Sequence, residues 1–404
     1  MIHKFSGRLR RPVAIGASVF MMAALGACGS SGSDSDTESI VIGYSAGLSG
    51  GAAAYGKNIE NGLKLAVQDL NEEGITVDGD DYKVELKSLD DEYDPSQTGT
   101  NVQRLVDQDD ANVVVVPHAG GIKASQELQD SGRAEFLLVA YSSDPAIVEQ
   151  GTDLTVMVPP SFESYVPAFI KKFKDQGAEK LGLLATSSEF GQQWTESMTK
   201  QWKEQGGEVL SDNSLDYGTV SDFAGPVSKT LGENPDTILI GGPSQPTALI
   251  IEEARKQGYD GSFMIVDQAK YEEMEQVTDP KNLNNTIGVA PVREYQEPGT
   301  EGFIDEYKDE IGEDEQPLTP ETTLNYQSLP IIVKAMEEAG TTDDVKAIRE
   351  AIPDALGDVE DRFQVTGFPD KITDKGHLLA DDLKVAYRDK DGKFDLIPVD
   401  QPEE

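Results

Sequence analysis

The chain has 404 residues, of which 74 are Asp or Glu and 34 are Lys or Arg, so its formal net charge is −40. This acidity is spread along the chain, and it argues against nucleic acid as a partner and against direct adhesion to anionic lipid, because both need basic contacts. The length exceeds what one hydrophobic core usually covers, so two lobes are expected.

The N-terminus has the layout of an export signal. Basic residues at positions 4, 8, 10 and 11 precede an apolar run over residues 13–25, which is too short to span a bilayer comfortably. The run ends in Leu25-Gly26-Ala27-Cys28, where small residues before a cysteine resemble the bacterial lipobox. Cys28 is the only cysteine, so it cannot form an intramolecular disulfide. We predict a lipoprotein signal peptide at residues 1–27 and a lipid on Cys28, which anchors the protein to the outer face of the cell membrane.

A polar segment follows the predicted lipid anchor. Residues 28–38 are rich in glycine, serine and acidic side chains with no large apolar residue to bury, which predicts a flexible tether. Arg10-Arg11 matches a twin-arginine signal only in part, and this favours general secretion.

The remaining chain alternates between strand and helix patterns. Short apolar runs rich in branched residues predict strands at residues 40–43, 84–89, 113–116, 136–139, 181–184, 237–240 and 263–266. Amphipathic segments between them predict helices, so the fold class is α/β with parallel sheets covered on both faces. Ligands in such sheets bind at the carboxyl ends of the strands.

Several helices show local features that fix their position. One helix begins near Tyr55, and the next has Asp94 as its N-cap with Pro95 at its first position. Pro167 interrupts an apolar helix face, which predicts either a kink or the first turn. Trp194, Met198 and Trp202 recur every four residues, and we interpret them as a buried packing stripe rather than an aromatic ligand cage.

Two motifs with chemical precedent lack the context that they need. Gly43-Tyr44-Ser45-Ala46-Gly47 matches a hydrolase nucleophile elbow, but a further loop separates it from the next helix, and only His118 and His377 follow as candidate bases. Residues 389–392 resemble part of a calcium loop without its closing glutamate, and they predict a hairpin turn between residues 383–387 and 394–397. We therefore expect neither catalysis nor a metal or other cofactor.

Three loops at predicted strand ends carry polar groups that a ligand can use. The first runs over residues 48–56 and brings glycine amides near Tyr55. The second, residues 117–121, contains Ala119 and Gly120 at a helix N-terminus, which favours an anion. The third holds Tyr141, Ser142 and Ser143 beside a turn. Together these loops predict a site for a carboxylate or a similar polar head.

A family resemblance becomes specific when these segments are taken in order. The chain resembles the leucine/isoleucine/valine-binding type of ABC transporter solute receptor, on residues 44–56, 89–95, 117–121, 141–145, 189–191, 221–223 and 241–242. The resemblance covers nearly the whole mature chain. It implies a type I periplasmic-binding fold, in which two lobes joined by three crossings close over a ligand. Residues 39–159 and 290–364 would form the N-terminal lobe, and residues 160–289 and 365–404 the C-terminal lobe.

The resemblance also implies ligand contacts, position by position. From the first lobe these are Tyr55, the Ala119 and Gly120 amides, Tyr141, Ser142 and Ser143; from the second they are Phe190, Gln245 within residues 243–246, and Asp267. The chain departs from the family pattern at three places. It has no serine at Ala119-Gly120, no carboxylate near Gln245, and Phe190 stands where tyrosine is frequent.

A buried ligand ammonium needs a charged or well-aligned acceptor. Glu189 or Asp267 would have to serve here, or the ligand is not an α-amino acid, which leaves amides, urea-like compounds and carboxylic acids open. We expect a monomeric solute-binding component that delivers this ligand to ABC permease and ATPase subunits. The alternatives are a ligand-sensing lipoprotein for a membrane receptor and a secreted serine hydrolase that uses Ser45.

Overall fold

The computed structural model describes residues 38–220, 222–312 and 316–401. The predicted signal peptide, the predicted lipidation site Cys28 and the predicted tether lie outside these residues, except that Glu38 already begins the first strand. Within the described ranges, no helix combines the length and apolarity needed to cross a bilayer.

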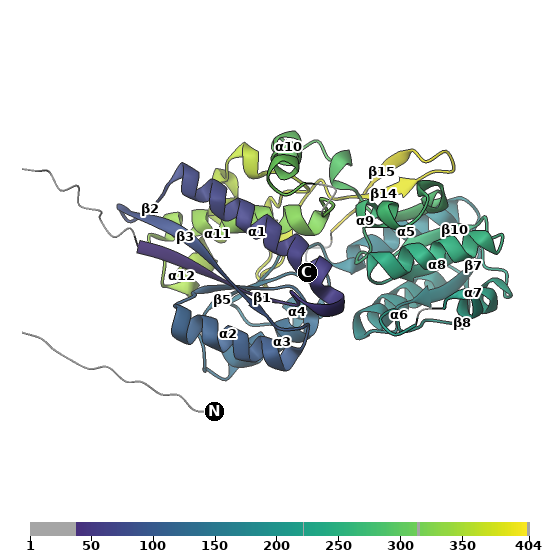
Figure 1. The fold of residues 1–404 in the computed structure, drawn as a ribbon, viewed down its shortest axis with the longest axis horizontal. Helices are drawn as coiled ribbons and strands as arrows, with labels where there is room; N and C mark the ends of the chain where they lie inside the picture. Colours follow the sequence, from purple (N-terminus) through teal and green to yellow (C-terminus); the bar gives the residue numbers. More distant parts are fainter. Residues whose placement is uncertain (1–37, 221, 313–315, 402–404) are drawn as a thin grey trace, which may run out of the picture. The chain divides into compact units, whose positions relative to one another are not determined.

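The first lobe is built on a six-stranded sheet in the order β2-β3-β1-β4-β5-β6, in which only the β2–β3 pair is antiparallel (Figure 1). Its strands are β1 Glu38–Ala46, β2 Ile75–Val77, β3 Asp80–Asp90, β4 Val113–Val116, β5 Leu137–Ala140 and β6 Thr155–Met157. Every side chain of β4 and β5 is buried, as an apolar run without alternation predicts for a strand covered on both faces.

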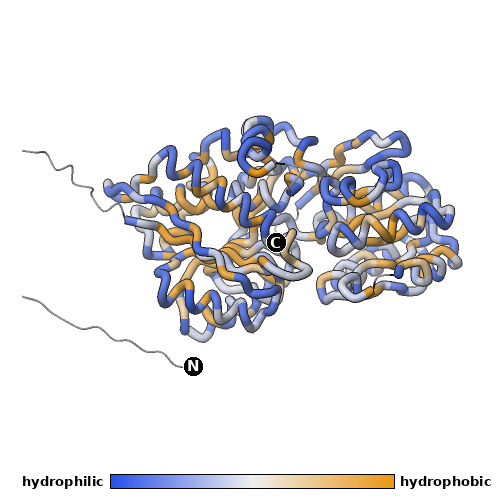
Figure 2. The backbone as a smooth tube through the Cα atoms, viewed as in Figure 1, coloured by the Kyte–Doolittle hydropathy of each residue, from blue (hydrophilic) through white to orange (hydrophobic). Residues whose placement is uncertain are grey.

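Helices cover both faces of this sheet, and successive strand residues are divided between them. Val113 and Val115 pack with α1 (Ala53–Glu73), α11 (Pro320–Ala339) and α12 (Val345–Ala355). Val114 and Val116 pack with α2 (Pro95–Asp109) and α3 (Ala119–Asp130) on the opposite face. Two further helices are α4 (Ala146–Glu149) and α10 (Thr300–Glu310). Figure 2 shows the resulting apolar layers inside a hydrophilic exterior.

The second lobe contains a seven-stranded sheet in the order β15-β14-β11-β10-β9-β7-β8. Its strands are β7 Lys180–Ala185, β8 Glu208–Asp212, β9 Thr237–Gly241, β10 Ser262–Ile265, β11 Thr286–Val289, β14 Lys384–Arg388 and β15 Phe394–Pro398. Its helices are α5 Phe162–Asp175, α6 Glu189–Glu204, α7 Ala224–Leu231, α8 Ser244–Lys256 and α9 Tyr271–Val277. The antiparallel β14–β15 pair confirms the hairpin predicted around residues 389–392.

The predicted helix features are largely confirmed. Asp94 caps α2 by accepting hydrogen bonds from the amides of Ser96 and Gln97, and Pro95 is the first helical residue. The Trp194 stripe of α6 is fully buried in the core of the second lobe. Pro167 lies inside α5, beyond its first turn, because the helix begins five residues earlier with Ser161 as its cap.

Residues 365–380 pack with the first lobe, so the predicted lobe boundary at residue 365 is too early. Val365 and Leu378 belong to the same apolar core as α1 and α11. The short strands β12 (Lys371–Ile372) and β13 (Leu378–Leu379) form a hairpin, and Met157 of β6 bridges to His377. Further along the chain, Leu383 packs in the core of the second lobe. The chain makes its last crossing after β13, just before β14.

His377 connects this last crossing to the first one, at Pro159 between β6 and α5. Its Nε2 lies 3.1 Å from the carbonyl oxygen of Pro159. A carbonyl only accepts, so Nε2 carries the proton and donates it. The side chain is buried, and burial lowers the pKa of His377 to about 4, although the Pro159 carbonyl opposes this shift.

This depressed pKa predicts a loss of stability in acid. Between about pH 6.5 and 4 the unfolded chain binds a proton at position 377 that the folded protein does not, so stability falls as the pH falls. His377→Gln keeps an N–H donor for Pro159 and removes the titration. We expect urea unfolding to show that the variant loses about 2 kcal/mol less than the parent between pH 7.5 and 4.5. Equal losses in both proteins would contradict this assignment.

The close packing of α1 against α11 requires glycine at position 62. A Cβ atom on Gly62 would lie 2.1 Å from the carbonyl oxygen of Thr322, and backbone cannot yield as a flexible side chain does. We expect Gly62→Ala to lower the free energy of unfolding by about 1–3 kcal/mol through overpacking. Gly302→Ala in α10 is the matched control, because its Cβ would meet nothing within 4 Å. In urea melts that control should be stabilised by about 0.5–1 kcal/mol; a loss of similar size in both variants would contradict the close-approach explanation.

Candidate functional site

The structure brings together the first-lobe residues expected to contact a ligand. Tyr55 lies in the first turn of α1, and its hydroxyl donates to the carbonyl oxygen of Pro117 at 2.9 Å. Its ring centroid is 6.3 Å from that of Tyr141, which follows β5. The loops after β1, β4 and β5 therefore meet at one edge of the first sheet, as parallel strand order requires.

The N-terminus of α3 supplies free backbone amides at this edge. His118 is the N-cap, and its Nδ1 accepts a hydrogen bond from the amide of Gly121 at 3.0 Å. The amides of Ala119 and Gly120 precede it in the first turn, where a helix has no internal acceptor for them. A Cβ on Gly120 would lie 2.7 Å from Pro95 Cγ, so glycine is required for this turn to pack on α2. The arrangement suits a carboxylate.

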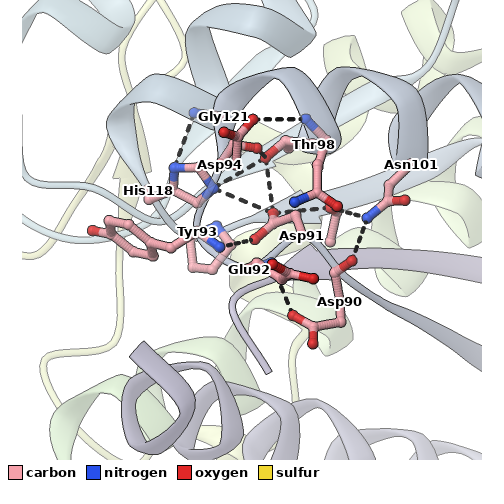
Figure 3. A network of polar contacts seen from close by, with 12 residues as sticks. Asp90, Asp91, Glu92, Tyr93, Asp94, Thr98, Asn101, His118 and Gly121 are labelled. Atoms are coloured by element: carbon pink, nitrogen blue, oxygen red, sulfur yellow. Dashed lines mark hydrogen bonds and ion pairs between the residues drawn. The ribbon is translucent and has the colours of Figure 1, made fainter. Parts of the chain in front are cut away.

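A buried network around Asp91 holds these loops in place (Figure 3). Asp91 Oδ2 accepts from Ser45 Oγ at 3.0 Å and Thr98 Oγ1 at 2.8 Å, and lies 3.2 Å from His118 Nε2. Asp91 Oδ1 accepts from the amide of Tyr93 at 2.9 Å. The network joins the end of β1, the loop after β3, α2 and the N-cap of α3.

The hydrogen bonds define which atoms donate and which accept between His118 and Asp91. His118 Nδ1 accepts from a backbone amide, so in this geometry Nε2 is the ring nitrogen that donates to Asp91. Burial alone would raise the pKa of Asp91. The pKa is nevertheless below its ordinary value, with His118 as the largest lowering influence, followed by the hydrogen bonds from Thr98 and the Tyr93 amide. Asp91 is therefore an ionised acceptor for four donors.

Ser45 has a structural role in this network. Its side chain is fully buried and its hydroxyl donates to Asp91. His118 Nε2 donates rather than accepts, so it is not a base for Ser45. The geometry gives the G-x-S-x-G match no exposed nucleophile.

The second-lobe candidates lie at different depths. Asp267 follows β10, is half-buried, and its Oδ1 accepts from Trp194 Nε1 at 3.1 Å. Phe190 in the first turn of α6 is half-buried, with its ring edge-on to Phe162 at 6.1 Å. Gln245 and Glu189 are exposed. Of the two carboxylates considered for a ligand ammonium, Asp267 is thus the one that the fold shields from water.

Asp267 faces the first lobe. Ser143 Oγ makes no hydrogen bond of standard geometry, yet it lies close enough to lower the pKa of the Asp267 carboxyl. Burial is the larger influence and the pKa of Asp267 is raised overall, with Lys270 opposing the rise. Burial raises the phenol pKa values of Tyr55, Tyr141 and Tyr165, and the Asp267 charge adds to the rise. These charge effects extend from Asp267 to residues of both lobes.

Sequence reasoning missed a set of charges that spans the two lobes. Lys270 Nζ of the second lobe lies 2.5 Å from Glu321 Oε1 at the start of α11, and both side chains are buried. Asn58 of α1 donates to Glu273 Oε1 of α9 at 2.9 Å. We call Asp267, Lys270, Glu273 and Glu321 the interlobe cluster.

Mutual charge effects shift the pKa values within the interlobe cluster. Burial would lower the pKa of Lys270, but the carboxylates of Glu321 and Asp267 raise it above the ordinary value. Burial raises the pKa of Glu273, and the nearby Glu321 adds to the rise. Lys270 is therefore firmly protonated.

The sequence contains a weak signal for this cluster. Glu321 follows Thr319-Pro320 at a helix start, where an acidic residue is fully explained by the helix dipole. Lys270 comes three residues after Asp267, beyond the loop that the family resemblance singles out. Only contact between the lobes reveals that these two residues pair.

Two hollows occur elsewhere in the described part of the chain. A cavity of about 10 Å³ lies beside the crossings, lined by Val158, Gln327 and Leu378 among others, and is large enough for one water. A groove of about 540 Å³ lies between α5 and residues 397–401 of the second lobe. Neither includes the strand-end loops.

The fold and the site together define a solute receptor with two lobes and a type I periplasmic-binding architecture. Residues 39–393 match the family of periplasmic binding proteins, and the chain belongs to that family. An amino acid binding protein of Pseudomonas aeruginosa is 24% identical over 369 residues, covering 89% of this chain and 92% of the relative. A Leu/Ile/Val-binding protein homolog of Brucella suis is 24% identical, covering 79% and 85%.

Solved structures show the same fold. A leucine binding protein from Thermotoga maritima superposes with a TM-score of 0.73 at 20% identity, covering 90% of this chain and 99% of that one. A branched-chain amino acid transporter substrate binding protein from Streptococcus pneumoniae, in complex with isoleucine, gives a TM-score of 0.73 at 20% identity and covers 90% and 100%. The predicted family and fold are confirmed.

The Asp91 network predicts a specific sensitivity. In Asp91→Asn an amide group replaces one carboxylate oxygen and faces donors, so at least one buried hydrogen bond is lost. We expect urea unfolding at pH 7 to show a loss of about 3 kcal/mol. Asp94→Asn, three residues along the same loop, is the control, because asparagine caps helices as well as aspartate does. A loss below about 1 kcal/mol for Asp91→Asn would mean that the network rearranges freely.

Proposed function

We propose that this protein is the extracytoplasmic solute-binding component of an ABC importer, which captures a branched-chain amino acid or a related small polar molecule between its lobes. The single observation that carries the proposal is the convergence of the strand-end loops of the first lobe, where the Tyr55 hydroxyl donates to the Pro117 carbonyl oxygen and the Tyr55 ring lies 6.3 Å from that of Tyr141. Family membership and the binding activity named for the relatives from Pseudomonas and Brucella support it.

The geometry divides the ligand between the lobes. A ligand carboxylate fits the Ala119 and Gly120 amides at the N-terminus of α3, where backbone N–H groups and the helix dipole favour negative charge. A ligand ammonium fits Asp267, whose second oxygen is not used by Trp194. Tyr55 and Tyr141 supply aromatic surface between them.

Closure follows from this division. A ligand held by groups of both lobes binds the closed state more tightly than the open one, so binding shifts the population toward closure. The closed form is then what the permease recognises. A lipid on Cys28 would keep the released protein at the membrane surface, and a monomer suffices for the cycle. No chemical conversion of the ligand is part of this function.

Ser143 tests the site without disturbing the fold. Its hydroxyl is buried but lacks a hydrogen-bond partner among the described residues, so Ser143→Ala should change the melting temperature of the free protein very little. Loss of a hydrogen bond to a charged ligand should weaken binding roughly tenfold. Ser164→Ala is the control, because that hydroxyl is equally buried and unpartnered but lines the groove beside residues 397–401.

The ligand comes from a thermal-shift screen of amino acids, amides, urea and small organic acids. Ligand at a hundredfold over its dissociation constant stabilises the protein by about 2.7 kcal/mol. Titration calorimetry then compares the two serine variants with the parent. Equal affinity in all three proteins would remove Ser143 from the site, and a panel without any shift would count against the proposed function.

A further inference from the structure

The interlobe cluster is unequal in sign. Asp267, Lys270 and Glu273 come from the end of β10 and the start of α9, whereas Glu321 comes from the first turn of α11 in the other lobe. Lys270 is the one cation among three carboxylates. It contacts Glu321 Oε1 at 2.5 Å and donates to the carbonyl oxygen of Asp267. Two carboxylates therefore have no cation of their own within the cluster.

An acceptor beside this excess charge is also unused. Glu321 Oε2 has no hydrogen-bond partner among the described residues, and the side chain is only 3% exposed, so water does not replace that partner. Ser143 Oγ is likewise buried and has no hydrogen-bond partner among the described residues. A buried carboxylate oxygen without a donor is costly, and a ligand that brings N–H groups removes that cost.

Aromatic rings border the same place. The Glu321 charge acts on both Tyr55 and Tyr141, whose phenol pKa values are raised first by burial. These two rings lie 6.3 Å apart by their centroids. Neutral tyrosine faces attract organic cations through their quadrupole. Carboxylates and rings together form surroundings that suit positive charge.

We infer that the interlobe cluster selects an organic cation, namely an amino acid whose side chain ends in an ammonium or guanidinium group. In this arrangement Asp267 accepts from the α-ammonium, and Glu321 Oε2 accepts from the side-chain cation. Lys270 keeps its contact with Glu321 Oε1. The two ligand cations balance the two excess carboxylates, and the ligand carboxylate binds at the N-terminus of α3. This inference rests on the proposed function, because it concerns the same site.

Other ligand charges fit the cluster less well. An acidic side chain directed at Lys270 would add a fourth carboxylate to the buried group, which raises the electrostatic cost of every other one. An aliphatic side chain would leave Glu321 Oε2 without a donor and would bury the excess charge uncompensated.

L-Lysine and L-norleucine provide a matched pair of probes, because they differ by the ε-ammonium alone. Calorimetry on the purified protein at pH 7.5 should show that L-lysine or L-arginine binds at least tenfold more tightly than L-norleucine, with L-glutamate weaker still. Glu321→Gln should reduce the ratio of lysine to norleucine affinity at least tenfold. Glu338→Gln, at an exposed position of the same helix, should leave the ratio unchanged.

The outcomes separate this inference from the proposed function. If L-leucine or L-norleucine binds as tightly as L-lysine, the inference is overturned and the proposed function stands. The same holds if only amides or carboxylic acids bind. If no compound of the whole panel binds, both fail. Should Glu321→Gln not fold, the comparison of L-lysine with L-norleucine in the parent protein decides alone.

Discussion

The central strands of both sheets are buried on both faces, and this constraint decides where polar chemistry can occur. Strands β4, β5, β9 and β10 have no exposed side chain, so their residues are committed to packing. Groups that must meet water or a ligand are left to the loops at the carboxyl ends, and parallel order brings those loops to one edge. The first lobe thereby presents helix amides, aromatic rings and Glu321, and the second lobe presents Asp267, Lys270 and Glu273.

Buried hydrogen bonds to Asp91 and His118 hold the loops of the first lobe in shape. Asp91 gathers donors from β1, α2 and the N-cap of α3, and the last of these, His118, also satisfies the amide of Gly121. The amides of Ala119 and Gly120 in the same turn have no acceptor within the helix. Asp91 is buried and accepts hydrogen bonds from four donors, so its role is to orient these loops.

Much of the fold was predictable because its evidence is local. Branched apolar runs predicted seven strands, and the structure has a strand at each of these positions. The cap at Asp94 fixed the start of α2. The hairpin of β12 and β13 was not predictable, since strands of two residues show no periodicity, and the last crossing was therefore placed too early. The pairing of Lys270 with Glu321 joins lobes that are distant in sequence, and each residue alone has an ordinary local explanation.

The close approach of α1 and α11 has a consequence for how ligand size is measured. Gly62 touches the backbone of Thr322, the neighbour of Glu321, while Tyr55 stands about two helical turns earlier on α1. Tyr55 and Glu321, two groups of the proposed site, therefore lie on helices that pack closely against each other. The distance between Tyr55 and Glu321 is therefore set within the first lobe and does not depend on how far the lobes open. Ligand length would change in evolution through the second lobe, whose groups move, and only with difficulty through the first.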